Sequence, residues 1–347
     1  MTGVQTCALP ILKALAEAYQ HRLFANEVML LPYYVASLNI EHAYYERMKQ
    51  YEAFPGLCFV DTLDMAEAQQ IGLFTAANTE RVAREKEAAI TVIIGNPPYN
   101  VGQKSENDNN KNRKHKVVDG RVRDTYAKDS AATNKNSLSD MYVKFFRWAA
   151  DRLKGRDGIV CFVSNNSFVD QIAFDGMRKH FLQDFERIDH IDLHGNVRRN
   201  PQLSGTTHNV FGIQVGVGIT LAIKKKGAAR QLRYHRVPEM WRKAEKLEFV
   251  AKGEIPWQTL TPDAEHAGWC WSTQTNTAGS PRSRISSVCT VAAFKRQGMA
   301  SSMTGIVTSS ASALRALSLA TTQRYIGIKL SQKPTGRFTS SGARALS

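Results

Sequence analysis

The stretch Ile93–Tyr99 reads IIGNPPY and closes an apolar run that starts at Ala88. A continuous run rich in β-branched residues is typical of a strand that is buried on both faces of a parallel sheet. Two successive prolines end the strand, because proline fixes the backbone φ and has no N–H to donate to a neighbouring strand. The stretch therefore predicts a buried strand whose carboxyl end presents an amide, two rigid prolines and an aromatic ring.

On both sides of this stretch, residues 12–226 alternate between patterns typical of strands and of helices. Strands are predicted at 23–27, 56–61, 88–95, 158–169, 187–195 and 211–223. Helices are predicted at 32–48, 65–74, 137–153 and 174–185. This order predicts an α/β fold with a doubly wound, Rossmann-like sheet, and the last two strands, which no helix separates, predict a terminal antiparallel hairpin at the sheet edge. Ligands of such sheets bind outside the carboxyl ends of the strands.

Three of the predicted strands end on polar groups, which are Glu27, Asp61 and the run Asn96–Tyr99. Each acid alone has a structural explanation, because a carboxylate is favoured at the start of a helix. An Asn-Pro pair alone is a common turn. The order of acid, acid and Asn-Pro-Pro-Tyr on successive strands is more specific than any one of these features. It predicts a ligand site at the carboxyl edge of the sheet.

The run Asn96-Pro97-Pro98-Tyr99 resembles the signature Asn/Asp-Pro-Pro-Tyr/Phe that follows the fourth strand in amino-methyltransferases dependent on S-adenosylmethionine. The resemblance implies that S-adenosylmethionine is the cofactor. It also implies that the acid ending the second strand of the family, here Glu27, binds the ribose hydroxyls of the cofactor. The acid ending the third strand, here Asp61, then holds its adenine.

The chemistry of this family gives the four residues their expected roles. An amine on an aromatic ring is a poor nucleophile, because its lone pair is delocalised. The side-chain carbonyl of Asn96 and the main-chain carbonyl of Pro97 would accept its N–H groups and aim the nitrogen at the methyl donor. Pro97 and Pro98 keep both acceptors rigid. Tyr99 would stack on a base that has left the duplex.

The four-residue motif alone leaves the substrate open, because enzymes that methylate RNA or a protein glutamine amide use a similar one. Further stretches resemble the methylase part of bacterial single-chain restriction–modification enzymes across residues 15–261: TYAKDSAATNKNSLSDMYVKFFRWAADRL at 125–153, DLHGNVRRN at 192–200 and NVFGIQVGVGI at 209–219. This resemblance implies N6 methylation of an adenine flipped out of double-stranded DNA. A non-catalytic DNA-binding remnant is the alternative from another class. The helicase and nuclease regions of such polypeptides are expected to be missing, and no Walker motif occurs.

The segment 103–136 is predicted to be a polar loop, since it holds nine Lys or Arg, five acids and six Asn. It is either a solvated insertion or a loop that becomes ordered on nucleic-acid phosphates. Residues 12–226 are expected to form the catalytic domain without its first strand and glycine-rich loop, which should precede Leu12. Residues 227–265 would begin the target-recognition region.

The two ends of the sequence are expected to be foreign to the domain. Residues 1–11, MTGVQTCALPI, do not read as a protein start. Residues 266–347 carry ten of the 46 basic residues and none of the 31 acids, so most of the formal charge of +15 belongs to this tail. The tail is either an out-of-frame translation or a disordered basic arm.

Metal binding and membrane insertion are not predicted. His190, Asp192 and His194 share one face of a predicted strand, but exposed polar residues at a sheet edge are the favoured interpretation. The five cysteines lack CxxC spacing, which favours free thiols in a reducing compartment. No apolar run approaches the ~18 residues of a membrane span, so a cytoplasmic protein is expected.

Overall fold

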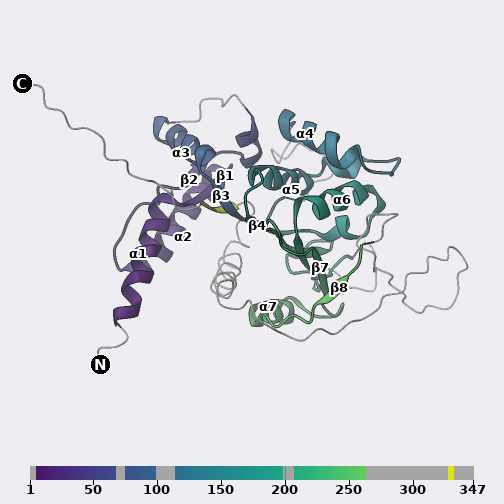
Figure 1. Ribbon diagram of the computed structural model, residues 1–347. Coiled ribbons are helices and arrows are strands. Elements are labelled where there is room, and N and C mark those ends of the chain that lie inside the picture. The colour runs from purple at the N-terminus through teal and green to yellow at the C-terminus, as the bar shows by residue number, and fades with distance from the viewer. Residues whose placement is uncertain are drawn as a thin grey trace, which may run out of the picture.

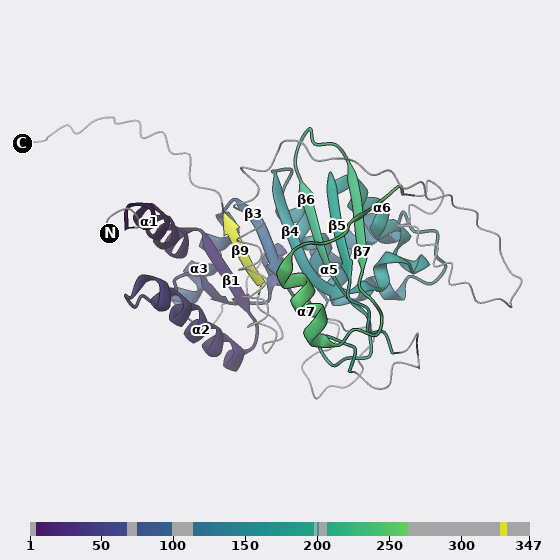
Figure 2. The ribbon, with the colours of Figure 1, turned by 90° about the horizontal axis from the view of Figure 1, so that it is seen from below.

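The computed structural model describes residues 5–67, 75–98, 114–197, 200, 207–262 and 327–331. Within these residues, nine strands form one mixed sheet in the order β2-β1-β9-β3-β4-β6-β5-β7-β8, which Figure 2 shows face-on. The strands are β1 (Leu23–Glu27), β2 (Leu57–Phe59), β3 (Ile90–Gly95), β4 (Gly158–Asn165), β5 (Arg187–Asp192), β6 (Val217–Lys224), β7 (Gln231–Arg236), β8 (Gln258–Leu260) and β9 (Gly327–Ser331).

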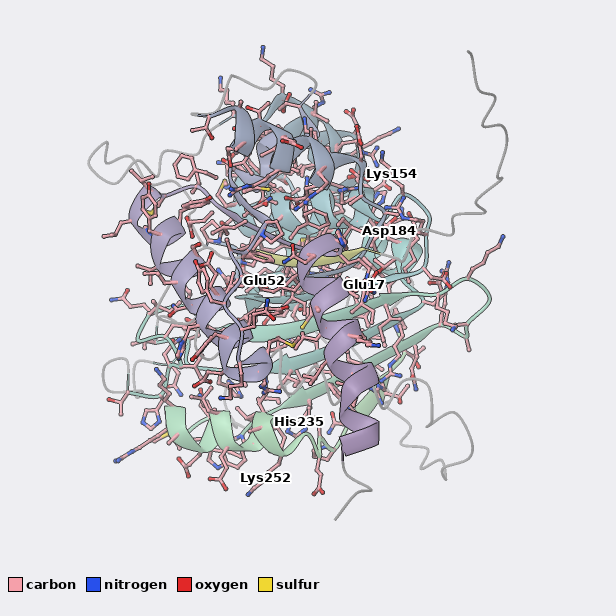
Figure 3. The ribbon with its side chains drawn as sticks, turned by 90° about the vertical axis from the view of Figure 1, so that its left-hand side faces the viewer. Glu17, Glu52, Lys154, Asp184, His235 and Lys252 are labelled. Atoms are coloured by element: carbon pink, nitrogen blue, oxygen red, sulfur yellow. The ribbon has the colours of Figure 1, made fainter. Side chains whose placement is uncertain are left out.

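Helices cover both faces of the sheet (Figure 1). They are α1 (Gln5–His21), α2 (Leu30–Met48), α3 (Ala76–Glu87), α4 (Lys116–Val122), α5 (Met141–Arg152), α6 (Asp175–Asp184) and α7 (Lys243–Lys252). The helices α3, α4, α5 and α6 lie on one face, and α1, α2 and α7 lie on the other. Figure 3 views the molecule from the side of α1 and α2, which run next to each other near Glu17 and Glu52. The α/β class predicted from the sequence is confirmed.

Alternation along the strands supplies apolar residues to both layers of core. Phe24 and Phe162 belong to the large cluster under α4, α5 and α6. Their neighbours point the other way, since Ala25 packs in the cluster with α1 and α2 and Val163 packs in the cluster with α7. A sheet that buries both faces is the expected outcome of helices wound on both sides.

The centre of the sheet differs from the predicted connectivity. A doubly wound sheet places its first strand between the second and the fourth, which here correspond to β1 and β3. That position is filled by β9, which runs antiparallel to both β1 and β3. Residues 327–331 thus form a strand within the range 266–347, which is expected to be either an out-of-frame translation or a disordered basic arm; the rest of that range lies outside the described residues. The predicted foreign origin of 1–11 is not tested, although residues 5–11 belong to α1.

The strand β6 corrects the predicted edge hairpin. It pairs antiparallel with both β4 and β5, and β5 pairs further with β7, so β6 is internal rather than terminal. The predicted strand 211–223 starts only at Val217. The glycines of this segment allow neighbouring side chains to approach its backbone closely. A Cβ on Gly218 would lie 2.5 Å from the ring of His190, and a Cβ on Gly216 would lie 2.5 Å from the amide of Asn166.

Three local predictions are also corrected. The segment 103–136 is not a loop throughout, because residues 116–127 form α4 and a π turn, η3 (Arg123–Ala127). The predicted helix 65–74 is a 3₁₀ turn, η1 (Thr62–Ala66), as far as the structure describes it. The helix predicted from Ser137 starts at Met141, after another 3₁₀ turn, η4 (Asn136–Ser139).

None of the helices in the described part of the chain combines the length and the apolar character that a membrane crossing requires.

Candidate functional site

Three strands carry polar residues where they end at one edge of the sheet, and each of these strand ends with its polar residue is called a corner. Because β9 is antiparallel to both β1 and β3, these two strands run parallel to each other, and β2 runs parallel to β1. Their carboxyl ends therefore share an edge. Glu27 is the last residue of β1, Asp61 follows β2 by two residues, and Asn96 follows β3 directly. The predicted positions are confirmed, and the predicted roles of these residues stay predictions.

Glu27 is a buried carboxylate with one unused oxygen. Glu27 is only 1% exposed. The atom Oε1 accepts from the backbone N–H groups of Val28 and Met29, at 2.8 and 2.9 Å. The atom Oε2 is buried and has no hydrogen-bond partner among the residues that the structure describes. Burial raises the pKa of Glu27, and the two backbone N–H groups oppose that rise.

A buried carboxylate oxygen without a hydrogen-bond donor lowers the stability of the fold unless a bound ligand supplies that donor. A hydroxyl donor, such as one from a ribose, would supply the missing bond. The carboxylate of Glu27 therefore fits the cofactor that the sequence resemblance implies.

Asp61 has both side-chain oxygens engaged. Its Oδ1 accepts from the backbone N–H of Leu63 at 2.9 Å and so caps η1. Its Oδ2 lies 3.2 Å from Nε2 of His115, which is the residue before α4. Each carboxylate oxygen can accept more than one hydrogen bond. Asp61 can therefore accept an adenine amino group, in an orientation that the protein has already fixed.

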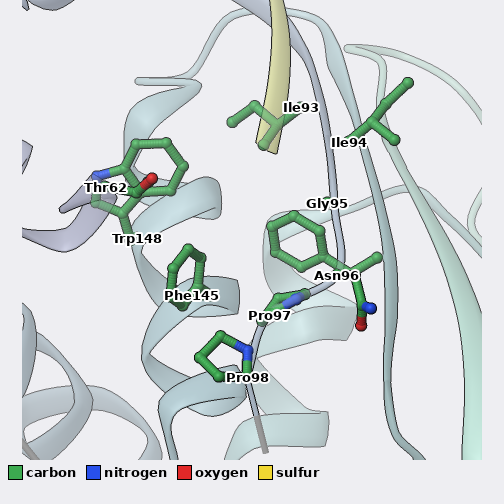
Figure 4. Close-up of a pocket in the computed structure, with 10 residues that line it drawn as sticks. Thr62, Ile93, Ile94, Gly95, Asn96, Pro97, Pro98, Phe145 and Trp148 are labelled. Carbon is green, nitrogen blue, oxygen red and sulfur yellow. The ribbon is translucent and has the colours of Figure 1, made fainter. Parts of the chain in front are cut away.

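The Asn96 corner lines a small apolar pocket (Figure 4). Its wall consists of Thr62, Ile93, Ile94, Gly95, Asn96, Pro97, Pro98, Phe145, Trp148 and Phe162. The free space is about 30 Å³, room for only a few water molecules. Phe145 and Trp148 of α5 lie across the pocket from Asn96.

The sequence interpretation did not identify the pocket residues outside the motif. Thr62 follows the acid Asp61, and Trp148 lies on α5, whose apolar period was recognised only as a core pattern. These residues become neighbours only in the folded chain, where η1 and α5 meet at the end of β3, so no local sequence pattern marks them. Tyr99, the predicted stacking ring, lies outside the described residues.

His190 and Asp192, interpreted as exposed strand residues, are buried in β5, whereas His194 is half-buried and lies after the end of β5. His190 is fully buried, donates or accepts through Nδ1 at 2.9 Å from Thr220, and stacks on Tyr234. Burial lowers the pKa of His190 to about 4. Asp192 accepts from the hydroxyl of Tyr234 at 2.7 Å. These residues form a polar layer within the core.

Asp61, Asp64 and His115 form another cluster, in which one ligand atom of each lies within 4.8 Å of the others. Such a set resembles a cation site in composition. However, the distance of 3.2 Å between His115 and Asp61 is that of a direct hydrogen bond. The cluster is therefore satisfied without an ion.

The fold and the order of the three corners define a class of α/β methylase domain. Residues 17–197, more than half of the chain, match the Eco57I restriction-modification methylase family, and the chain belongs to that family. No curated protein matches the chain.

Solved structures of larger enzymes resemble this chain. DrdV, in its cryo-EM complex with DNA, is 43% identical with a TM-score of 0.67, and the match covers 74% of this chain and 25% of DrdV. LlaBIII, an ATP-dependent Type ISP restriction-modification enzyme bound to DNA, is 31% identical with a TM-score of 0.68, covering 76% and 19%. A nuclease-deletion mutant of the Type ISP enzyme LlaGI, with a DNA substrate mimic, is 31% identical with a TM-score of 0.69, covering 76% and 23%. The chain thus spans about a fifth to a quarter of the length of these relatives.

Proposed function

We propose that this chain is the methyl-transfer segment of a restriction–modification polypeptide, and that its reaction is transfer of a methyl group from S-adenosylmethionine to N6 of adenine in double-stranded DNA. The observation that carries the proposal is the shared edge of Glu27, Asp61 and Asn96, in the order that the family's chemistry requires. Membership in a restriction-modification methylase family supports the same reaction class.

The donor side of the site is assigned to Glu27 and Asp61. When bound, S-adenosylmethionine supplies a methyl group made electrophilic by its sulfonium. Glu27 Oε2, the buried oxygen without a partner in the described part of the chain, would accept from a ribose hydroxyl. Asp61, held by Leu63 and His115, would accept from the adenine amino group. The two acids would therefore fix the cofactor by its two polar parts.

The acceptor side is assigned to Asn96 and Pro97. The side-chain carbonyl of Asn96 and the main-chain carbonyl of Pro97 would accept the two N–H groups of the target amine. Pro97 is buried and Asn96 is partly exposed, so the corner is anchored on one side and reachable on the other. Two rigid acceptors restrict the amine to one orientation, which lowers the entropic part of the barrier.

The substrate is assigned as DNA because all three structures described above are complexes with DNA or a DNA mimic. The target base would have to flip out of the DNA duplex, since N6 of an adenine that is paired within the duplex cannot reach a pocket at the edge of the sheet. Tyr99 would then stack on the base. The helicase and nuclease regions of the larger relatives would act on the same DNA.

The test is methyl incorporation from labelled S-adenosylmethionine, measured in parallel with double-stranded DNA, RNA and a protein bearing exposed glutamine amides. We expect incorporation into adenine of DNA alone. Asn96→Ala should lower kcat by about 100-fold or more, as the loss of one aligned polar group does in other enzymes, with the melting temperature unchanged. Asn134→Ala is the matched control, because Asn134 is exposed in a turn between η3 and η4.

The outcomes separate the alternatives. Methylation of RNA or of the amide instead of DNA would replace the proposed substrate. DNA binding that weakens with salt, without transfer to any acceptor, would indicate a non-catalytic remnant. Full activity of Asn96→Ala would overturn the assigned mechanism.

A further inference from the structure

The corner after β2 is contacted by a residue that lies 54 positions later in the chain. His115 immediately precedes α4, and its side chain is fully buried. Its Nε2 lies 3.2 Å from Asp61 Oδ2 and 3.8 Å from Asp64 Oδ1. Because a carboxylate can only accept, Nε2 carries the proton of this bond. The atom Nδ1 has no hydrogen-bond partner in the described part of the chain, so Nε2 makes the side chain's polar contact there.

Several bonds fix His115 itself. Its backbone N–H donates to Asp119 Oδ2 at 3.0 Å, and Asp119 Oδ1 lies 2.7 Å from Nζ of Lys144 on α5. The backbone N–H of Val117 donates to Glu67 Oε1 at 2.9 Å, just after η1. The start of α4 is therefore tied both to α5 and to the segment that begins with Asp61. These bonds hold the backbone from which the imidazole extends toward Asp61.

The two oxygens of Asp61 consequently have different partners. Oδ1 is held by Leu63 in the same corner, while Oδ2 is held by His115 from a distant segment. A carboxylate held at one oxygen can still rotate about its terminal torsion, which is broad. Two donors on different atoms restrict that rotation and set the directions of the lone pairs that stay available to a ligand.

We propose that His115 is the positioning residue for Asp61, and that it orients this carboxylate for the adenine of the cofactor. This inference rests on the cofactor role proposed above for Asp61. His115 does not touch the cofactor and acts only through Asp61. The length and the buried position of the imidazole suit it to this task, because it bridges α4 and the β2 corner with a single rigid ring.

The test is S-adenosylmethionine affinity of the full chain, measured by calorimetric titration into the millimolar range. His115→Leu keeps a buried apolar side chain but removes the donor, and we expect affinity to fall about tenfold, the scale seen when an orienting partner is lost. His115→Gln can place an amide N–H near the position of Nε2 and should restore affinity to within about threefold. A purely structural role for His115 would lower the melting temperature of both variants and would give no such rescue.

The matched control is His180→Leu. His180 on α6 makes a similar bond, 2.9 Å from Nε2 to Asp129 Oδ2, at a place outside the three corners. Its substitution should leave affinity unchanged. In the unsubstituted chain, the ¹⁵N signal of His115 Nε2 should shift when S-adenosylmethionine is added, while that of His180 should not. This measurement does not depend on whether a variant folds.

The failures of the two proposals can be distinguished. If Asp61→Asn lowers affinity and His115→Leu does not, His115 is not a positioning residue while the role of Asp61 stands. If Asp61→Asn leaves the affinity for S-adenosylmethionine unchanged, the proposed cofactor role of Asp61 is wrong, and the inference about His115 is wrong as well. Selective broadening of the His115 signals by added Mn²⁺ would assign the cluster to a cation and would also overturn the inference.

Discussion

At the scale of single residues, the two acids predicted to bind the cofactor differ in how many of their carboxylate oxygens already have hydrogen-bond partners in the protein. Glu27 keeps a buried oxygen without a partner in the described residues, whereas both oxygens of Asp61 are bonded. The sequence could place both acids, because each follows an apolar run that ends there. It could not predict the contact with His115, because nothing local links residues 54 positions apart.

Glu27→Gln should change how stability depends on pH. Burial raises the pKa of Glu27, so the folded protein binds this proton more tightly than the unfolded chain does. The associated stabilisation is complete below the unfolded pKa of about 4.3 and is lost as pH rises through the higher folded pKa. We therefore expect the melting temperature of the Glu27→Gln variant, relative to the unsubstituted chain, to be higher at pH 7.5 than at pH 4.5.

Thermal melts at the two pH values provide this measurement. Glu87→Gln controls for the loss of one charge, because Glu87 is an exposed glutamate at the end of α3. The same variants should separate stability from function, since Glu27→Gln should also weaken binding of S-adenosylmethionine. An equal difference at both pH values would contradict a raised pKa of the buried Glu27 carboxylate.

At the scale of elements, the apolar strands were predictable and the polar helices were not. The runs that became β3 and β4 are long enough and rich enough in β-branched residues to be recognised without context. The helix α3 escaped prediction because Val82 is its only fully buried apolar side chain, while Asn78 and Glu85 are buried polar ones. The helix α4 lies within a segment whose composition suggested a solvated loop. In both cases tertiary contacts, rather than a local period, stabilise the helix.

The strand β9 should be sensitive to proline. Lys329 pairs with Phe24 of β1 and with Ile93 of β3, so both edges of its backbone are engaged. Proline has no N–H and is excluded from central strands. We expect Lys329→Pro to lower the free energy of unfolding by about 3 kcal/mol, the order seen when proline interrupts regular structure.

Urea unfolding measures this effect. Lys329→Val is the matched control, because it removes the same charge but keeps the backbone N–H and favours a strand. Equal stability of the proline variant and the unsubstituted chain would show that β9 contributes little to the sheet.

At the scale of the whole molecule, one helix presents an apolar face to solvent. Large apolar side chains of α2 are exposed, among them Leu31 at 74%, Tyr34 at 58% and Leu38 at 67%. Their spacing of three and four residues places them on one side of the helix. An exposed patch of this kind favours association. Because both core layers lie elsewhere, the patch adds nothing to the stability of the fold.

The paired change Leu31→Ser with Leu38→Ser should therefore reduce self-association without lowering stability. Dynamic light scattering should show a smaller mean size at high protein concentration, and the melting temperature should stay within a few degrees. Leu57→Ser, the same change at a residue of β2 that is 1% exposed, should instead destabilise the fold by about 3 kcal/mol. Unchanged scattering for the paired variant would mean that the face of α2 is not adhesive.

The central position of β9 also has a consequence for when the site can form. The strands that carry Glu27 and Asn96 do not pair with each other and are joined in the sheet through β9, which is synthesised more than 200 residues after β3. At ~5–20 residues per second, that interval is roughly 10 to 50 s. Until β9 is made, the strand that carries Glu27 and the strand that carries Asn96 have no shared neighbour in the sheet. On a ribosome, the strand ends of Glu27 and Asn96 would therefore be joined in one sheet only after residues 327–331 have been synthesised.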